Sequence, residues 1–328
     1  MIICVVALCL FFTANRVEAN ENGISFSVEA LTNEGESNQQ GFYQLEGKPS
    51  ESEQLKIKIN NLTDTKIIID VAVNTAFTNQ NGIPSYTKAE IPDDTLKYPI
   101  ETILKLSDGT LVLEPEASQI LDVTVDYPTE EWEGQLLGGI RFTEENDQQA
   151  DTSIIHQVAY TIGVLLTMEE GVLPENSLTL NEVIASQRNY RSFIEANIQN
   201  TSPIIVSNME VNAEIKNLDS SKTIYEYSAI DMRMAPNSNF NLGIPTGNVP
   251  LQAGQYKLLI HALADTKEYT WEKEFEISAS QARELNQSAV NLESGNNQML
   301  YLIISGLLFV LVLILSIVLV NKKRKNLK

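Results

Sequence analysis

Apolar and polar residues alternate along most of the chain from about residue 24 to residue 277, in short runs separated by turn residues. In Leu55-Lys-Ile-Lys-Ile59 and in Val158-Ala-Tyr-Thr-Ile-Gly-Val164, every second side chain is apolar or aromatic. A period of two places one face of a strand in a core and the other face in water. Turn-forming pairs such as Asn81-Gly82 and Asp108-Gly109 separate such runs. The pattern therefore predicts an all-β protein built from antiparallel sandwiches.

The alternating runs form two groups, which predict two tandem Ig-like β-sandwiches over residues 23–145 and 153–279. A hydrophilic stretch separates the two groups. The segments 55–62 and 193–200 both alternate and both end in Asn followed by a turn, which indicates two related domains. Tyr256 follows a glycine turn and begins an alternating run, as in the tyrosine corner of Ig-like domains.

Both ends of the chain carry apolar runs. The first run predicts a signal peptide over residues 1–19. The uncharged run 299–320 would reach about 33 Å as a helix, enough for one transmembrane helix. The basic tail 321–328 predicts a cytoplasmic end, and the polar residues 280–298 predict a stalk. We therefore expect a single-pass protein of the cell membrane, with both sandwiches outside the cell and only the tail in the cytoplasm.

Charge narrows the range of partners. The chain holds 43 acidic and 23 basic residues, a net charge of −20, and setting aside the five basic residues of the tail leaves −25 for the exported part. Such a charge excludes nucleic acid as a partner, and it makes any contact with an anionic cell wall local and specific. The two cysteines, Cys4 and Cys9, lie in the predicted signal peptide, so the mature protein has no disulfide and no cysteine–zinc site.

Signals for catalysis are weak. The sequence has no His-Glu-x-x-His, no Gly-x-Ser-x-Gly and no glycine-rich phosphate loop. The two histidines, His156 and His261, lie in alternating runs and are read as sandwich residues. Paired acids are expected by chance in a chain this acidic, and the pair Asp93-Asp94, a weak calcium candidate, does not match the twelve-residue calcium loop. The sequence therefore predicts no enzymatic activity, no cofactor and no metal.

Some aromatic residues are better candidates for binding. The segment 38–45 places two aromatic rings beside amides, a composition suited to sugars. Trp132 comes shortly before Gly138-Gly139, and adjacent glycines at a strand indicate a bulge or a close backbone approach. For each of these aromatic residues a core position is the alternative. The candidates for a glycan contact are Asn38, Gln39, Phe42, Tyr43 and Trp132.

Residues 234–247, Met-Ala-Pro-Asn-Ser-Asn-Phe-Asn-Leu-Gly-Ile-Pro-Thr-Gly, contain no charge. Pro236 fixes one backbone angle, and the side chains that follow it can close a turn. Two interpretations stay open: the segment packs as a turn, with apolar residues buried on either side, or it contacts a partner. In the second interpretation the candidates are Met234, Asn237, Asn239 and Phe240.

These motifs together resemble the WxL-interacting proteins of Gram-positive bacteria. Phe26-Ser-Val28 and Trp132-Glu-Gly134 follow the pattern of the family's first domain, and Asn189-Tyr190-Arg191 and Met234–Phe240 follow the pattern of its second. The resemblance covers nearly the whole chain. It implies a non-enzymatic cell-surface scaffold, in which the first domain binds peptidoglycan and the second binds host factors and joins complexes with WxL-domain surface proteins.

Two other functions stay open at this point. One is a wall-processing hydrolase that uses paired carboxylates, and the other is a surface receptor that signals through a partner helix. For the scaffold, several weak contacts on one chain would raise the effective concentration of each. An exposed sheet edge would also be able to accept a partner's strand.

Overall fold

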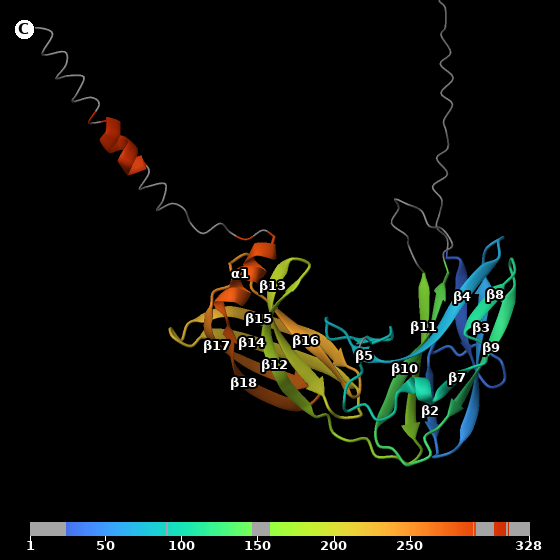
Figure 1. Ribbon diagram of the computed structural model, residues 1–328. Helices are drawn as coiled ribbons and strands as arrows, with labels where there is room; N and C mark the ends of the chain where they lie inside the picture. Colours follow the sequence, from blue (N-terminus) through green and yellow to red (C-terminus); the bar gives the residue numbers. More distant parts are fainter. Residues whose placement is uncertain are drawn as a thin grey trace, which may run out of the picture. The chain divides into compact units, whose positions relative to one another are not determined.

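The computed structural model describes residues 24–89, 91–145, 158–290, 292, 305–312 and 314. Its strands form two compact units, each described here by itself (Figure 1). The all-β prediction agrees with this structure. The division along the chain is less simple, because two short segments in the first half of the sequence belong to the second unit. The first unit holds the chain up to Ala76, Tyr86–Ile91 and Lys97–Leu173; the second holds Phe77–Ser85, Pro92–Leu96 and the chain from Pro174.

Two sheets form the first unit. The four-stranded sheet has the order β1-β3-β9-β7, and the five-stranded sheet has the order β2-β11-β10-β4-β8. A 3-10 turn, η1 (Ile100–Thr102), precedes β7. The strand bounds are β1 Phe26–Leu31, β2 Tyr43–Gly47, β3 Ser52–Asn61, β4 Ile67–Thr75, β7 Leu104–Leu106, β8 Thr110–Leu113, β9 Ser118–Asp126, β10 Gln135–Glu144 and β11 Ala159–Met168.

The pairing differs from the sequence prediction at β11. This strand lies within residues 153–279, but it pairs antiparallel with β10 in the first unit. It also pairs in parallel with β2, so the sheet is mixed where a purely antiparallel one was expected. The physical reason is burial: Ile162, Val164 and Leu166 all point into the core of the first unit. The Asp108-Gly109 turn likewise joins strands of different sheets, β7 and β8, and makes no hairpin.

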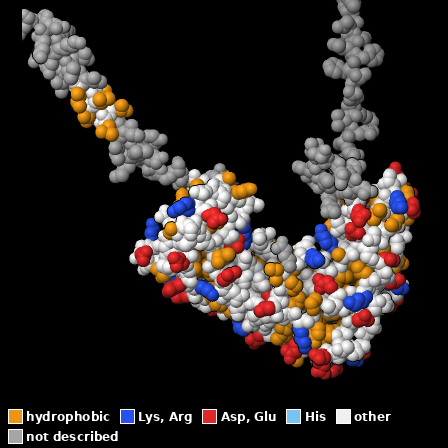
Figure 2. Space-filling view, in the orientation of Figure 1, with side chains coloured by type: hydrophobic (Ala, Val, Ile, Leu, Met, Phe, Trp, Pro, Cys, Tyr) orange, Lys and Arg blue, Asp and Glu red, His pale blue; other side chains and the backbone are white. Residues whose placement is uncertain are grey.

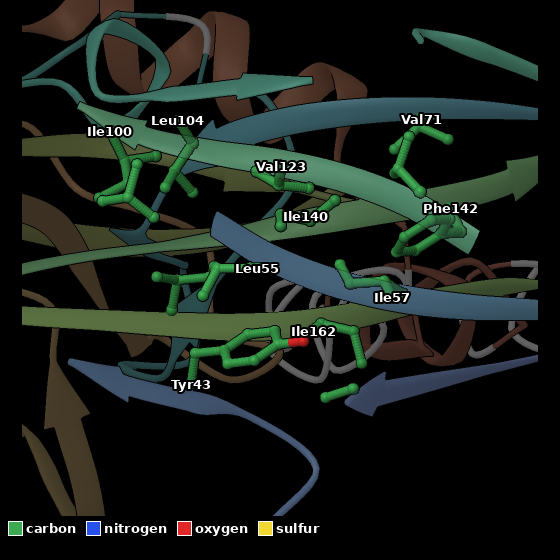
Figure 3. Packing of buried hydrophobic residues seen from close by; sticks show 14 of the residues in the cluster. Tyr43, Leu55, Ile57, Val71, Ile100, Leu104, Val123, Ile140, Phe142 and Ile162 are labelled. Atoms are coloured by element: carbon green, nitrogen blue, oxygen red, sulfur yellow. The ribbon is translucent and has the colours of Figure 1, made fainter. Parts of the chain in front are cut away.

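The core of the first unit lies between these sheets. Alternate residues of β3, β9 and β10 are fully buried in it, as the period of two predicts. Figure 3 shows Leu55, Val123 and Ile140 from these strands, with Tyr43 and Ile162 in the same cluster.

Two further sheets form the second unit. The three-stranded sheet has the order β12-β13-β16, and the four-stranded sheet has the order β15-β14-β17-β18. A short hairpin of β5 and β6 also belongs to this unit. The strand bounds are β5 Phe77–Thr78, β6 Pro84–Ser85, β12 Leu178–Arg188, β13 Arg191–Asn200, β14 Val206–Asn217, β15 Thr223–Met234, β16 Ser238–Pro245, β17 Gly254–Ala264 and β18 Lys267–Ile277.

The tyrosine corner predicted at Tyr256 is confirmed. The Tyr256 hydroxyl donates a hydrogen bond to the Gln252 carbonyl, four residues upstream, at 2.9 Å. The ring packs beside Phe275, with 5.6 Å between the ring centroids. The side chain thereby fixes the chain where it enters β17.

The predicted transmembrane helix is wrong. Among the residues that the structure describes, no helix is both long enough and apolar enough to cross a membrane. Within the range 299–320, the described residues 305–312 and 314 are helical. The expected single-pass topology and membrane localisation depended on this helix and are therefore not supported. The predicted signal peptide and basic tail lie outside the described residues, as does His156.

Candidate binding surfaces

Two of the predicted glycan-binding residues, Tyr43 and Trp132, lie inside the core of the first unit. Tyr43 is 5% exposed, and its hydroxyl donates a hydrogen bond to the Lys56 carbonyl at 2.6 Å. Burial raises the pKa of this hydroxyl. Trp132 is 3% exposed, and its ring stacks on Tyr127 with 5.8 Å between the ring centroids. Both rings therefore stabilise the fold and do not face a ligand.

The other three candidates lie in the loop between β1 and β2. The Asn38 side chain closes this loop, since its Nδ2 donates to the Phe42 carbonyl at 2.9 Å and its Oδ1 accepts from the Gln40 N–H at 3.1 Å. Gln39 is exposed, and Phe42 is 40% exposed. Asn38 thus shapes the loop, whereas Gln39 and Phe42 are accessible.

A pair of glycines lies next to Phe42 on the outer face of the five-stranded sheet. Gly139 of β10 and Gly163 of β11 are direct cross-strand partners. The residues that follow Gly139 and precede Gly163, Ile140 and Ile162, point into the core, so the glycines are on the opposite face. A Cβ atom at Gly163 would lie 3.7 Å from Phe42 Cβ.

The ring of Tyr86 lies across this glycine pair. A Cβ atom at Gly139 would be 3.0 Å from Tyr86 Cδ1, and one at Gly163 would be 3.9 Å from Tyr86 Oη. The ring therefore takes up space that a side chain at position 139 would need, and its hydroxyl end lies beside Gly163, the same glycine that Phe42 approaches. We call Phe42, Tyr86, Gly139 and Gly163 the glycine–aromatic surface.

A hydrogen bond to its main-chain carbonyl holds Tyr86 in this position, and this bond does not involve the side-chain hydroxyl. The Asn74 Nδ2 donates to the Tyr86 carbonyl at 3.0 Å. Burial raises the pKa of Tyr86, so the hydroxyl stays protonated at neutral pH. Within the described part of the chain, no hydrogen-bond partner is found for Tyr86 Oη. The group is thus able to donate to a ligand.

The sequence did not identify Tyr86, although it contained a signal. The pair Gly138-Gly139 predicted a close approach, and this prediction is confirmed on both faces of the sheet. A Cβ atom at Gly138 would lie 2.4 Å from Ile100 Cγ2 on the inner face, and Gly139 lies under Tyr86 on the outer face. The pattern of residues does not reveal which distant side chain makes the approach.

In the second unit, the uncharged segment 234–247 begins as a buried turn. Met234 and Phe240 are 0% and 4% exposed and lie in the core, so neither side chain faces a partner. Asn237 has a left-handed φ of 44°, and its Nδ2 donates to the Thr201 carbonyl at 3.1 Å. These contacts favour the interpretation of the segment as a turn.

A segment from the first half of the sequence packs on this turn, within the second unit. The Ala235 N–H donates to Thr78 Oγ1 at 3.0 Å, and Thr78 Oγ1 lies 2.6 Å from Ser238 Oγ. The exposed Asn239 donates through Nδ2 to Asp93 Oδ2 at 2.5 Å. The polar groups of the turn are therefore paired within the fold.

Asp93 is a structural acceptor. Burial works against its charged form, but hydrogen bonds from Asn239, Thr95 and Gln199 outweigh burial and hold the pKa of Asp93 below its usual range. A carboxylate surrounded by donors is poorly arranged for a calcium ion, because the donors already occupy its lone pairs. The described residues contain no group of three or more His, Cys, Asp or Glu side chains that could hold a metal.

An open groove of about 950 Å³ lies on the second unit. One wall comes from β15, with Tyr227 and Ile230, and the floor comes from β16, with Leu242 and Gly243. The other wall includes Arg188, beside the tight turn between β12 and β13. This volume is near the upper end for ligand-binding clefts. We call it the β15–β16 groove.

Comparison with protein families matches most of the chain. Residues 26–144 match the model described as WxL Interacting Protein, peptidoglycan binding domain. Residues 149–287 match the model described as WxL Interacting Protein, host binding domain. Both descriptions name binding domains. A comparison with curated protein sequences gave no match.

A comparison with solved structures found matches of low similarity, several of them bacterial fimbrial chaperones. One is the chaperone–tip adhesion subunit complex CsuC–CsuE of Acinetobacter baumannii, at 13% identity and a TM-score of 0.34, covering 76% of this chain and 98% of that one. Another is the Escherichia coli chaperone DraB, at 14% identity and a TM-score of 0.29, covering 77% of this chain and 98% of that one. Likeness this low carries no functional argument.

Proposed function

Because the chain belongs to the WxL interacting protein family, we propose that the glycine–aromatic surface of its first unit binds the glycan strands of peptidoglycan. The observation that carries this proposal is the position of Tyr86 over Gly139 and Gly163, with Phe42 beside it. Sugar rings present flat apolar faces and hydroxyl edges. They suit a surface that offers aromatic rings with a few polar groups around them.

The polar groups around this surface support the same ligand. Tyr86 offers a hydroxyl donor, and the exposed Gln39 offers an amide in the same loop as Phe42. Arg141 follows Gly139 by two positions on β10, hence on the same face of the sheet, and is half-buried. The guanidinium of Arg141 could pair with the carboxylates of the peptide stems of the wall. Elsewhere the negative net charge of the chain repels such anions.

For the second unit we propose binding of protein partners, namely WxL-domain surface proteins and host factors. The β15–β16 groove supports this role, since it is large, open and lined by both apolar and cationic side chains. A chain that holds the cell wall through one unit and a protein through the other acts as a scaffold. Each contact raises the effective concentration of the other, so both can be weak.

Co-sedimentation of the full chain with purified peptidoglycan tests the glycan proposal. We expect Phe42→Ala and Tyr86→Ala each to weaken binding about fivefold or more, the effect of removing a central aromatic contact. Val112→Ala is the matched control, because Val112 is an exposed apolar residue of the same sheet on β8. Equal losses in all three variants would refute the assigned surface.

The same assay separates binding from hydrolysis. A scaffold leaves the sedimented wall intact, so we expect no soluble wall fragments in the supernatant over time. Release of fragments that disappears when a single Asp or Glu is replaced would favour the hydrolase alternative. Capture of a purified WxL-domain surface protein by the full chain tests the protein-partner proposal independently.

A further inference from the structure

The groove of the second unit lies between the outer edges of two strands, and Gln80 and Asn81 of the β5–β6 hairpin also line it. β16 ends the three-stranded sheet and pairs only with β13, while β15 ends the four-stranded sheet and pairs only with β14. An edge strand has main-chain N–H and C=O groups that are free to pair with another chain. At its Ser238 end, β16 lies against the β5 segment of the same unit. The groove lies farther along, where Leu242, Gly243 and Pro245 form its floor. Arg188 already donates to the Asn241 carbonyl at this edge, so a partner strand would pair with the main chain of Gly243 and the carbonyl of Pro245.

The groove also exposes side chains that would normally be covered. Tyr227 and Ala229 of β15 pack against the core of the unit but remain half-buried. They are uncovered because the opposite sheet ends at β16, one strand short of the width of its partner sheet. An additional strand beside β16 would cover both residues, together with the exposed Ile230.

The charge of the groove is opposite to that of the chain. Arg188 and Arg191 line it, and no acidic residue does, although acidic side chains are spread over both units (Figure 2). Arg188 is engaged within the fold: its Nε lies 2.8 Å from Glu195 Oε1, and its Nη2 donates to the Asn241 carbonyl at 2.6 Å. Arg191 is exposed and forms no ion pair with any described residue. One uncompensated positive charge is therefore presented to an occupant.

The turn beside Arg191 is held in a demanding conformation. Asn189 and Tyr190 have φ angles of 50° and 60°, a two-residue hairpin turn in which the second position usually holds glycine. The Tyr190 carbonyl accepts a hydrogen bond from the Val290 N–H at 2.9 Å, which stabilises the turn. The Tyr190 side chain is 67% exposed. Strained backbone concentrates at functional sites, and exposed Tyr and Arg are common in binding hot spots.

We propose that the β15–β16 groove binds an extended acidic peptide segment of a protein partner, which adds as a strand to the free edge of β16. Main-chain hydrogen bonds to β16 supply affinity. Apolar side chains at alternate positions of the peptide cover Tyr227 and Ala229, and a carboxylate pairs with Arg191. This inference rests on the proposed protein-binding role of the second unit and names the chemistry of the partner.

Selection of nine-residue peptides from a random library on the full chain tests this proposal. We expect the selected peptides to alternate apolar and polar residues and to contain Asp or Glu. Arg191→Gln should weaken binding of such a peptide about fivefold, and Ile230→Asp should weaken it at least as much. Arg233→Gln is the matched control, since Arg233 is an exposed arginine of β15 that does not line the groove.

Hydrogen exchange of the full chain with a selected peptide locates the contact. Slower exchange of the Asn241 and Gly243 amides, which face away from β13, supports strand addition to β16. The proposal is overturned by selected peptides without acidic residues, by binding that Arg191→Gln leaves unchanged, or by protection at another edge such as β18. It is also overturned if Arg191→Gln changes the oligomeric state, which would assign the groove to a second copy of the chain.

Failure of this inference can be distinguished from failure of the proposed function. If the Arg191→Gln chain still captures a purified WxL-domain protein at full strength, the protein-binding role stands and the groove is not its site. If acidic peptides bind the groove but no WxL-domain protein or host factor is captured, the peptide site stands and the assigned partner class is wrong.

Discussion

At the residue scale, one asparagine in each unit closes the end of a core strand with the same hydrogen bonds. Asn61 ends β3 and Asn200 ends β13, and both are buried. In each, Oδ1 accepts from the N–H two residues later, and Nδ2 donates to the carbonyl four residues later and to a carbonyl from another segment of the unit. The local partners are Thr63 and Thr65 for Asn61, and Ser202 and Ile204 for Asn200.

Replacing Asn200 should therefore destabilise the second unit. Asn200→Ala leaves the Ser202 N–H and the Ile204 carbonyl without this partner and removes one of two donors to the Ala235 carbonyl, and we expect a loss of about 2–3 kcal/mol in the free energy of unfolding. Urea denaturation measures this change. Asn212→Ala is the control, because Asn212 is an exposed asparagine of β14, and its loss should stay within about 0.5 kcal/mol. Similar losses in both variants would contradict the role of Asn200.

The sequence predicts these local hydrogen-bond motifs better than it predicts which side chains are exposed. The shared Asn endings and the tyrosine corner at Tyr256 both depend on residues within a few positions, so their patterns are readable. For Tyr43 and Trp132 the sequence left a ligand-facing position and a core position both open, because the residues that surround them come from elsewhere in the chain. The Tyr43 hydroxyl donates to the carbonyl of Lys56 on another strand, and Trp132 stacks on Tyr127 within the core. A polar sequence context does not exclude burial when a distant carbonyl satisfies the hydroxyl.

At the element scale, the predicted stalk of residues 280–298 begins with a helix that packs on the second unit. Helix α1 (Ala279–Ser288) starts at Ser278, whose Oγ accepts from the Gln281 N–H at 3.2 Å. Ala282 is buried in the core, and Leu285 packs against it. The docking of this helix could not be predicted from the sequence, because only two apolar residues contact the unit and two are too few to produce a clear helical period.

Charge placed on this docking face tests its contribution. We expect Ala282→Asp to lower the free energy of unfolding of the second unit by roughly 2–3 kcal/mol, because it buries a carboxylate without a partner. Gln287→Asp adds the same charge on the exposed side of the helix and should have little effect. Thermal unfolding of the full chain compares the two variants. If both melt like the unmodified chain, α1 is a detached stalk.

At the scale of the whole molecule, the units do not follow the simple order of the sequence. β11 comes after the hydrophilic break but completes the first unit, and residues 77–85 come early but belong to the second. The alternating pattern predicts strands and their buried faces, yet strand pairing is set by contacts between residues far apart in the chain. The glycine–aromatic surface was hidden for the same reason, since Tyr86 and Gly163 are brought together only by the fold.

This arrangement predicts that a residue within 26–144, the range that matches the peptidoglycan-binding family model, controls the stability of the second unit. Thr78 is within residues 26–144, but its buried hydroxyl accepts from Ala235 and contacts Ser238 in the second unit. Thr78→Val keeps the shape of the side chain and leaves the Ala235 N–H unpaired, so we expect a loss of about 1–3 kcal/mol. Hydrogen exchange measures the loss separately for each unit.

The faster exchange in Thr78→Val should appear in β13, β14 and β16, and not in the sheets of the first unit. Thr110→Val serves as the control, because Thr110 is an exposed threonine on β8 of the first unit, and its replacement should leave exchange in the second unit unchanged. Faster exchange confined to the first unit in Thr78→Val would show that residues 77–85 fold with the sequence around them. The second unit would then be complete without that segment, and the turn at residues 234–240 would have to be held by its own strands.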